Sequence, residues 1–339
     1  MNLTTLVHEG IARIAALPPG NWGNADAGAP LTVPLIAEDY PAKTAIMWNS
    51  MYQRLLVPDR NMMLVADPKD LDRIMEAFRA DPRYRGGGAG VGFKEAIIPF
   101  LDEVTPLAKA IGAVNIVKKD GRGRLVGDNT DGEGYARSLE ELLAAGGRPI
   151  AGSRVIMLGA GGSGRAIAFA LAKAGARLDI LNRTEDKAHE LAKSLNRYFG
   201  TALTSGGGRG LLPSLIGEAN AVVSVIDDAA SPLDAYSTLG DMELPITVAS
   251  VERNHATAEA LLKKARRELV VSDIRIRKET TPMLFEAAAL GFRTLDGIPM
   301  VINQGVAAFW WLYSDQLVRR GVSQADIAET MSAAAKRQT

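Results

Sequence analysis

The chain has 339 residues, close to the length at which a single hydrophobic core divides, so two domains are expected. Its 39 basic and 39 acidic residues balance without a long block of either sign, which argues against a nucleic-acid partner or a polybasic membrane face and favours a small-molecule substrate. Cysteine is absent, which excludes disulfides, thiolate nucleophiles and cysteine-ligated metal sites.

The first patterned segment predicts a short helix. Val7, Ile11 and Ile14 fall at helical spacing, and the Pro-Pro-Gly run at 18–20 would end the helix. The segment has no basic region before its apolar residues and no small-residue cleavage site after them, so a secretion signal is not expected. No stretch approaches the ~18 apolar residues of a membrane span. We therefore expect a cytoplasmic protein without a membrane segment.

Strands and helices then alternate. Strands are expected at LTVPLIA (31–37), NMMLVAD (61–67) and GAGVGF (88–93), with helices at Ile46–Leu56 and Leu71–Arg79. This alternation is typical of an α/β domain with a mainly parallel sheet.

Residues 112–132 predict a hairpin that runs into a polar segment. Strands at Ala113–Lys118 and Arg124–Val126 flank a glycine-containing turn. Asn115 and the Asp-Asn-Thr-Asp run at 128–131 go beyond what a turn requires, which indicates a site. The following helix, Gly132–Ala145, ends at a Gly-Gly pair and a proline, which marks the expected domain boundary.

A second α/β series begins at the strand Arg154–Leu158, which meets a glycine-rich turn and a helix that ends at Lys173. Residues 205–210 are expected to form a loop, and Ser323 to cap a last helix. The further expected elements are strands at Arg177–Leu181, Ala221–Val225, Ile246–Ser250, Leu269–Asp273 and Arg293–Leu295, and helices at Glu185–Asn196 and Val301–Arg320.

The three histidines, His8, His189 and His255, lie far apart in polar helical contexts. Surface positions are therefore expected, and neither a Ser-His-Asp triad nor a metal site is.

The glycine-rich turn follows a strand and opens a helix, which is the context of a dinucleotide-binding motif. Glycines let the backbone approach a pyrophosphate, and the helix N-terminus supplies amide donors. The alternative is a tight strand-to-helix turn without a ligand. The residues expected to bind the cofactor here are Gly159, Gly161, Gly162, Ser163 and Gly164.

The end of the next strand indicates which nucleotide binds. An NAD site expects an acidic residue there, about 20 residues after the motif. This strand instead ends at Leu181 and is followed by Asn182, Arg183 and Thr184, while Asp179 lies two residues inside it and should point elsewhere. Arg183 can stack on adenine and pair with a 2′-phosphate. The sequence therefore favours NADP, with NAD as the alternative.

Lys94 and Asp131, which both precede the nucleotide motif in the sequence, are candidate catalytic residues. Lys94 is expected at the start of a helix, where a cation opposes the helix dipole. Asp131 is expected at a strand-to-helix junction, where an N-terminal cap is the alternative role. Spacing alone does not place the two side chains together.

Four ordered stretches together resemble the shikimate dehydrogenase family over most of residues 31–320. They are FKEAIIPFLDEVTPLAKAIGAVNIV (93–117), GRLVGDNTDGEGYARSLEE (123–141), VIMLGAGGSGRAIAFALAKAGARLDILNRT (155–184) and TPMLFEAAALGFRTLDGIPMVINQGVAAF (281–309).

The resemblance implies an N-terminal α/β substrate domain and a Rossmann dinucleotide-binding domain, with the active site in the cleft between them. The expected substrate domain is residues 1–132 with 300–339, including an N-terminal extension at 1–30, and the Rossmann domain is 133–299. The resemblance also implies an enzyme of aromatic amino acid biosynthesis. A monomer or a homodimer is expected.

The resemblance also assigns roles to single residues. Lys94 and Asp131 would form the catalytic pair. Lys94 would pass the proton, and Asp131 would hold and tune the lysine electrostatically. The substrate would contact Thr44, Asn115 and Gln304. The cofactor would be clamped by Asn182, Arg183 and Thr184 and contacted by Gly297 and Met300.

The residues expected around a substrate carboxylate depart from the family. Ala42 stands where the family has a serine, and Gly90 stands where it has a threonine. Gly90 lies in a run at 88–92 in which Gly88 and Gly92 also lack side chains. Ile276 replaces a tyrosine, and residues 224–228 replace an Asn-Ala-Thr loop. We expect a wider pocket in which Arg275 or Arg277 could meet a larger group. The alternative is an alignment slip, with the hydroxyls supplied by Thr44 and Ser50.

The expected function is an NADP-preferring dehydrogenase that transfers hydride between nicotinamide and a ring alcohol or ketone of a shikimate- or quinate-like cyclic hydroxy acid. Two alternatives stay open. One is a nucleotide- or metabolite-binding module without turnover, and the other is a reductase of a different carbon skeleton on the same fold.

Overall fold

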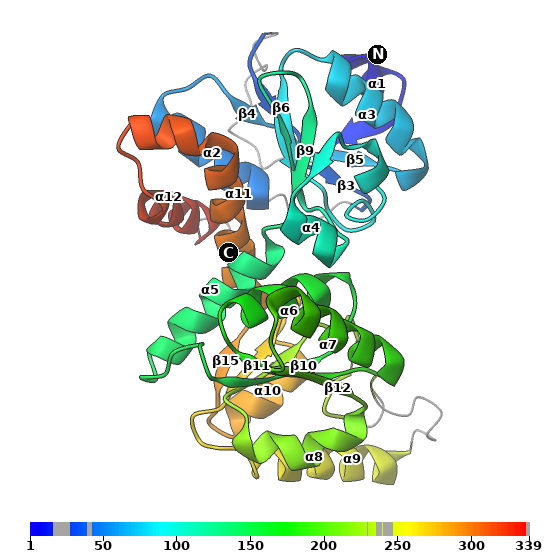
Figure 1. Ribbon diagram of the computed structural model, residues 1–339, viewed down its shortest axis with the longest axis vertical. Coiled ribbons are helices and arrows are strands. Elements are labelled where there is room, and N and C mark those ends of the chain that lie inside the picture. The colour runs from blue at the N-terminus through cyan, green and yellow to red at the C-terminus, as the bar shows by residue number, and fades with distance from the viewer. Residues whose placement is uncertain (16–27, 39–42, 229, 235–238, 240–246, 337–339) are drawn as a thin grey trace. The chain divides into compact units, whose positions relative to one another are not determined.

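The computed structural model describes residues 1–15, 28–38, 43–228, 230–234, 239 and 247–336, which form two compact units (Figure 1). Unit 1 comprises Met1–Thr130 and Ile302–Thr339, and unit 2 comprises Asp131–Val301. These bounds lie within two residues of the domain bounds expected from the sequence. The role of each unit stays a prediction.

The strands of unit 1 are short and form two sheets. They are β1 Ala12–Ile14, β2 Leu31–Thr32, β3 Leu35–Ile36, β4 Arg60–Asn61, β5 Leu64–Ala66, β6 Tyr84–Gly88, β7 Glu103–Val104, β8 Ile116–Lys119 and β9 Leu125–Asp128. The larger sheet has the order β4-β2-β6-β8-β9-β7, and the smaller one β1-β5-β3. In the larger sheet β6/β8 and β8/β9 are antiparallel, and the other pairs are parallel.

Helix α11 begins in unit 2 and continues into unit 1, where it joins the unit's own helices. The bounds are α1 Leu3–His8, α2 Lys43–Leu55, α3 Leu71–Ala80, α4 Pro106–Ile111, α11 Gly297–Arg319 and α12 Gln324–Lys336, with short 3-10 turns at Pro68–Asp70 and Ile98–Phe100. Helix α3 buries Leu71, Ile74, Met75 and Phe78 on one face, which is the spacing of an amphipathic helix. Phe78 stacks on Tyr84 of β6 in the core of the unit.

The expected N-terminal helix is shorter than predicted. Helix α1 is capped by the Asn2 side chain and ends before Gly10, which has a φ of +72°. Ile14 lies instead in β1, where Ala12–Ile14 pairs antiparallel with β5. Pairing with a distant strand thus overrides the local helical spacing. The expected helix end at 18–20 lies outside the described residues.

Two expected strands of unit 1 are displaced. The strand expected at 31–37 is divided between β2 and β3, because Pro34 has no N–H to donate to a ladder. The strand expected at 88–93 lies earlier, at Tyr84–Gly88. This strand needs glycine because the neighbouring backbone lies too close for a side chain. A Cβ at Gly87 would lie 2.1 Å from the Val33 carbonyl oxygen. The expected hairpin is confirmed as β8 and β9.

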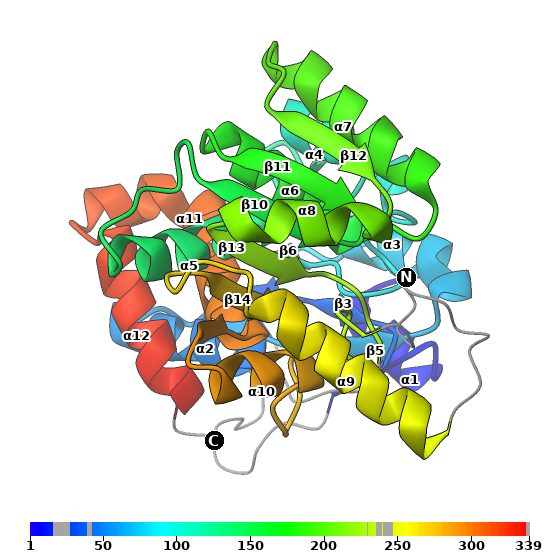
Figure 2. The same cartoon turned by 90° about the horizontal axis from the view of Figure 1, so that it is seen from below.

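Unit 2 is a parallel sheet of the order β12-β11-β10-β13-β14-β15, whose central strands follow one another in Figure 2. The expected strands at 154–158, 177–181 and 293–295 are confirmed. The bounds are β10 Arg154–Leu158, β11 Arg177–Leu181, β12 Thr204–Gly207, β13 Ala221–Ser224, β14 Val270–Asp273 and β15 Arg293–Leu295, with helices α5 Asp131–Ala144, α6 Gly162–Lys173, α7 Glu185–Phe199, α8 Leu212–Leu215, α9 Val248–Leu262 and α10 Pro282–Ala289, and 3-10 turns at Arg209–Leu211 and Ile216–Glu218.

Two predictions for unit 2 are wrong. The loop expected at 205–210 contains strand β12, and Gly206 is required there because a Cβ would lie 2.5 Å from the Ala188 carbonyl oxygen. The strand expected at 246–250 is the start of α9, for which Thr247 and Ser250 form a capping box. Ile246 itself lies outside the described residues.

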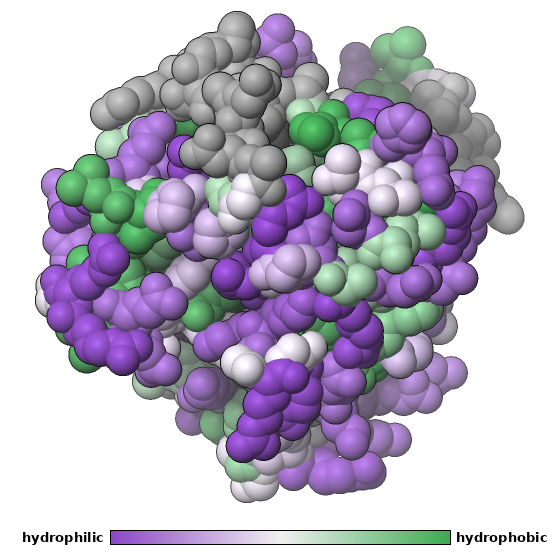
Figure 3. Space-filling view, turned by 90° about the horizontal axis from the view of Figure 1, so that it is seen from above, coloured by the Kyte–Doolittle hydropathy of each residue, from purple (hydrophilic) through white to green (hydrophobic). Residues whose placement is uncertain are grey.

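Among the described residues, no helix is long and apolar enough to cross a membrane. On the face drawn in Figure 3, hydrophilic residues predominate and hydrophobic residues form small scattered groups.

The close approach at Gly87 gives a stability prediction. In Gly87→Ala the new methyl group would collide with Val33, so we expect the free energy of unfolding to fall by about 1–3 kcal/mol. The matched control is Gly121→Ala, where no atom lies within 4 Å, and its effect should stay within about 0.5 kcal/mol. Urea unfolding of the three proteins measures this. Equal stability of the two variants would contradict the packing described here.

Candidate active site

Three side chains from distant parts of unit 1 form one hydrogen-bonded cluster. The Asn115 amide nitrogen donates to Gln304 Oε1 (3.0 Å) and to Thr130 Oγ1 (3.2 Å). Its Oδ1 accepts from the Thr130 backbone N–H (2.8 Å), and the Thr130 hydroxyl donates to the Gln304 carbonyl (3.3 Å). Asn115 and Thr130 are buried, and Gln304 is half-buried. The structure thus brings together the predicted substrate ligands Asn115 and Gln304.

Backbone bonds fix Asn115 from both sides. Its N–H donates to the Asp128 carbonyl (3.0 Å), and its own carbonyl accepts from Ala89 (2.8 Å) just beyond β6. Asn115 is therefore held between two neighbouring parts of the sheet, which leaves its side chain to organise the cluster.

The other polar residues of this hairpin secure its fold. Asp128 Oδ1 accepts from the Thr105 hydroxyl (2.5 Å) and from the Asn129 N–H (2.8 Å). The Asn129 amide donates to the Ala113 carbonyl (3.0 Å). Thr130, which the sequence reasoning did not single out, is the residue of the run that contacts both predicted ligands.

Lys94 lies close to this cluster through its backbone. Its carbonyl accepts a hydrogen bond from the Val114 N–H (2.8 Å), one residue before Asn115. The expected helix at Lys94 is wrong, because residues 91–97 form turns, so the argument from a helix dipole does not apply. The Lys94 side chain is half-buried.

Asp131 is the first residue of α5 and is buried, as the predicted strand-to-helix junction requires. The peptide bond joins it directly to Thr130 of the cluster. Lys94 belongs to unit 1 and Asp131 to unit 2, and their pairing stays a prediction.

Thr44 is the second residue of α2 and is half-buried. Helix α2 packs against the helix that carries Gln304, since a Cβ at Gly305 would lie 3.2 Å from Met47 Cε. The predicted ligands Thr44 and Gln304 thus lie on two helices that contact each other closely. Ala42 lies outside the described residues.

The expectation of extra room at Gly90 is wrong. A Cβ at this position would lie 2.9 Å from Ile36 Cγ2 and 3.0 Å from the Leu35 carbonyl oxygen. Ile36 is buried, so its methyl group occupies the space that a threonine side chain would need. The missing hydroxyl is therefore not replaced by a cavity at this point.

Both arginines near Ile276 pair with a carboxylate. Arg275 forms a buried ion pair with Asp273, with 2.6 Å between Nη2 and Oδ2, and its side chain is 8% exposed. Arg277 pairs with Asp227 at the surface (2.7 Å). Ile276 itself is 45% exposed. The expected role is therefore not supported for Arg275, and for the exposed Arg277 it stays a prediction.

The glycine-rich turn of unit 2 fits a bound pyrophosphate. Gly159 has a φ of +109°, and a Cβ there would lie 2.8 Å from Val225 Cγ2. Gly161 caps α6, and no atom lies within 4 Å of the position that a Cβ would take there, so this side of the turn is open. Gly162 and Ser163 form the first residues of α6, whose N–H groups have no partners within the helix. The turn thus combines tight packing on one side with open amide donors on the other.

The residues after β11 support the expected nucleotide clamp. Asn182 Oδ1 accepts from the Ala160 N–H (3.3 Å), and its amide nitrogen donates to the Thr184 carbonyl (3.0 Å), which ties this segment to the glycine turn. Arg183 and Thr184 are exposed. Asp179 points elsewhere, as expected, because it pairs with Arg154 (2.7 Å) and accepts from the Ser205 hydroxyl.

The remaining predicted cofactor residues lie at the start of α11. Gly297 is its first residue, and a Cβ there would lie 2.0 Å from the Ile274 carbonyl oxygen. Met300 is buried one turn later. Both positions are therefore tightly packed, and their contact with a cofactor stays a prediction.

The three histidines are exposed, as expected. Among the described residues, no group of three or more His, Asp or Glu side chains could hold a metal ion.

Family comparisons match both units. The family described as "Shikimate dehydrogenase substrate binding domain" matches residues 41–117, and "Shikimate / quinate 5-dehydrogenase" matches residues 142–226. The chain is 33% identical to shikimate dehydrogenase (NADP(+)) of Desulfitobacterium hafniense over 268 residues, which cover 79% of this chain and 86% of the relative.

Solved structures agree. Shikimate dehydrogenase from Aquifex aeolicus superimposes with a TM-score of 0.68 at 27% identity, covering 91% of this chain and 98% of the other. The ligand-free 5-ketofructose reductase of a Gluconobacter strain superimposes with a TM-score of 0.65, also at 27% identity, covering 90% and 98%.

The residues after β11 lead to a prediction for cofactor binding. We expect NADP to bind more tightly than NAD, because the Arg183 guanidinium can pair with the 2′-phosphate. In Arg183→Ala the affinity for NADP should fall by about 1.5–3 kcal/mol while that for NAD changes little. Arg177→Ala, at the opposite end of β11, is the matched control. Calorimetric titration of both cofactors measures this, and wild-type binding of NAD as tight as that of NADP would refute it.

Proposed function

The chain belongs to the shikimate dehydrogenase family, and on that premise we propose how its residues carry out the reaction. It is an NADP-dependent oxidoreductase of the shikimate dehydrogenase type, acting on a secondary alcohol of a small ring substrate or on the corresponding ketone.

The observation that carries the proposal is the cluster of Asn115, Thr130 and Gln304 beside the backbone of Lys94. Neutral amide and hydroxyl groups held in one geometry suit the hydroxyl groups of a ring alcohol. Because Gln304 Oε1 accepts from Asn115, the nitrogen at the other end of the Gln304 amide is the proposed donor to a substrate oxygen.

Lys94 is the proposed acid and base. As the alcohol is oxidised, its O–H proton passes to the Lys94 amine, and in the reverse direction the ammonium returns the proton to the carbonyl oxygen. When bound, NADP⁺ would accept the hydride from the alcohol carbon, and NADPH would supply it to the carbonyl carbon. Asp131, buried at the start of α5, is the proposed partner that holds the lysine amine in place.

The NADP clamp is proposed on unit 2. The amide donors at the N-terminus of α6 would hold the pyrophosphate, with Gly159 and Gly164 keeping the turn compact against Val225. The exposed Arg183 and Thr184 would hold the 2′-phosphate.

A shikimate- or quinate-like cyclic hydroxy acid is the first candidate substrate, on the strength of the family. A neutral keto sugar is the second, because a structural relative is a 5-ketofructose reductase. The second candidate is favoured by Gly90, where Ile36 excludes the side chain that would supply a hydroxyl donor to a carboxylate.

The test of the function is a substrate panel. Cyclic hydroxy acids and keto sugars are offered with NADP or NADPH, and with NAD or NADH, while the absorbance of the reduced cofactor is followed. Turnover of at least one ring alcohol or ketone with NADP(H) is expected. Tight NADP binding without any turnover would favour a binding module. The monomeric or dimeric state and the cytoplasmic location stay predictions.

Lys94 and Asp131 can be tested separately from cofactor binding. In Lys94→Ala, kcat should fall about 10²–10⁴-fold, the usual contribution of general acid and base catalysis, while the Kd for NADP is unchanged. Asp131→Asn should lower kcat similarly and raise KM, so both constants are measured. The control is Lys109→Ala, an exposed lysine of α4. Wild-type turnover by Lys94→Ala would remove this lysine from the mechanism.

Shikimate itself should be a poor substrate. Each hydroxyl donor missing from a desolvated site costs about 1–3 kcal/mol, or roughly 5- to 150-fold in affinity. We therefore expect kcat/KM for shikimate with NADP to stay below about 10⁵ M⁻¹s⁻¹. The analogue with a hydroxymethyl group in place of the carboxylate should react at least as well. A value for shikimate above that limit would restore an ordinary shikimate dehydrogenase.

A further inference from the structure

Helices α2 and α11 meet through a ladder of aromatic residues. On α11, Gly305, Phe309 and Tyr313 follow one another at four-residue steps, so they lie on one face. Phe309 packs edge-on against Trp48 of α2, with 5.3 Å between ring centroids, and Tyr52 contacts both Phe309 (5.5 Å) and Tyr313 (6.0 Å). The ladder therefore sets the spacing and rotation of α11 relative to α2.

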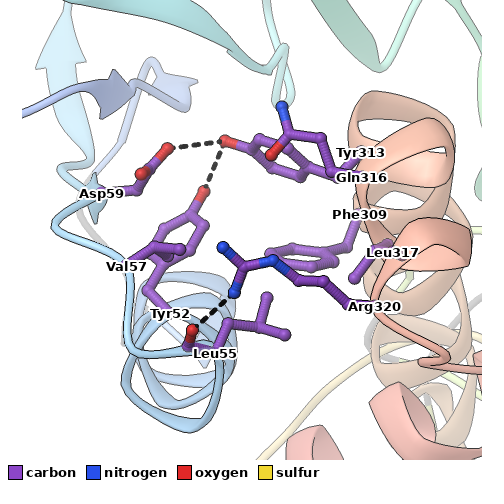
Figure 4. Close-up of a pocket in the computed structure, with 9 residues that line it drawn as sticks. All are labelled: Tyr52, Leu55, Val57, Asp59, Phe309, Tyr313, Gln316, Leu317 and Arg320. Carbon is purple, nitrogen blue, oxygen red and sulfur yellow. Dashed lines mark hydrogen bonds between the residues drawn. The ribbon is translucent and has the colours of Figure 1, made fainter.

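A chain of hydrogen bonds closes the far end of this ladder, as Figure 4 shows for its last links. The Asn61 amide donates to Thr32 Oγ1 (2.9 Å), which is bonded to the Tyr52 hydroxyl (2.9 Å). The Tyr52 and Tyr313 hydroxyls are 3.0 Å apart, and Tyr313 donates to Asp59 Oδ1 (3.5 Å). This series of hydrogen bonds thus connects α11 to α2, β2 and the residue before β4.

The end of this series at Asp59 orients the two tyrosines. An ionised Asp59 can only accept, so Tyr313 donates to it and the Tyr52 hydroxyl can donate to Tyr313. The Thr32 hydroxyl has a second acceptor in the Arg60 carbonyl (3.4 Å). Burial raises the pKa of Tyr52 and of Tyr313, which keeps both hydroxyls protonated and able to donate. Hydrogen bonds in such a series strengthen one another.

We propose that Tyr313, Tyr52 and Asp59 are positioning residues that hold Gln304 in place for the substrate. Tyr313 lies nine residues after Gln304, about 13.5 Å along the same helix, so it does not share a ligand with it. Because the helix is stiff, a shift or rotation at Tyr313 displaces Gln304 and lengthens its 3.0 Å bond to Asn115. This inference rests on the proposed function, in which Gln304 donates to a substrate hydroxyl.

Removal of one hydroxyl tests the inference by kinetics. In Tyr313→Phe, with shikimate as the probe at saturating NADP, KM should rise about 3- to 10-fold while kcat changes less than about 2-fold. The Kd for NADP should be unchanged. Tyr198→Phe, which removes a hydroxyl from α7 of unit 2, is the matched control. An unchanged KM in Tyr313→Phe would overturn the inference.

A double-mutant cycle separates positioning from a general loss of stability. If Tyr313 acts through Gln304, adding Tyr313→Phe to Gln304→Ala should raise KM no further. Effects on KM that multiply would overturn the inference. Asp59→Asn, which keeps an oxygen acceptor for Tyr313, should retain the wild-type KM, whereas Asp59→Leu should behave as Tyr313→Phe does.

An NMR measurement that needs no turnover tests the positioning role separately from the proposed function. In protein labelled with ¹⁵N-asparagine, the side-chain amide resonance of Asn115 reports its bond to Gln304. Tyr313→Phe should shift this resonance in the direction seen in Gln304→Ala, and Tyr198→Phe should not. A wild-type protein that turns over nothing would refute the proposed function, and an unshifted Asn115 resonance in Tyr313→Phe would overturn the positioning role in either case.

Discussion

The site of unit 1 depends on one side-chain amide. Asn115 uses both ends of its amide, accepting from the Thr130 N–H and donating to Gln304 Oε1, and so joins the hairpin to a helix that is 189 residues away in sequence. A buried amide left without these partners would cost about 1–3 kcal/mol, so the arrangement is specified by hydrogen bonding as well as by packing. It also determines which end of the Gln304 amide is available to a ligand.

Glycines allow close packing in both units, independently of the Asn115 hydrogen bonds. At Gly87 and Gly206 a neighbouring backbone lies where a side chain would be, and at Gly159 the side chain of Val225 does. At Gly90 the methyl group of Ile36 and the Leu35 carbonyl oxygen together occupy the excluded space. The hydroxyl donor missing at Gly90 is therefore not replaced by open space, so the pocket is not enlarged at this point.

The sequence predicted most strands of the second sheet, because apolar strands and the glycine turn are local signals. Two of the predicted substrate ligands, Asn115 and Gln304, are hydrogen-bonded to each other in the structure, while their role and that of Arg183 stay predictions. Prediction from the sequence failed where tertiary contacts decide. The strand at Tyr84–Gly88 and the strand β12 are glycine-rich, so they lack the side chains by which strands are recognised, and β1 forms only because β5 is there to pair with it. Thr130 and the Tyr52–Tyr313 contact join segments that no local pattern connects.

The central claim is that the Asn115 cluster receives the reacting ring. A crystal structure of the protein with NADP⁺ and a ring alcohol from the substrate panel tests it most directly. The account predicts ring hydroxyl groups within about 3.2 Å of the Gln304 amide nitrogen and of Asn115, with the reacting oxygen within hydrogen-bond distance of Lys94 Nζ. A ring bound away from Asn115 and Gln304, with Lys94 remote from the reacting oxygen, would contradict it.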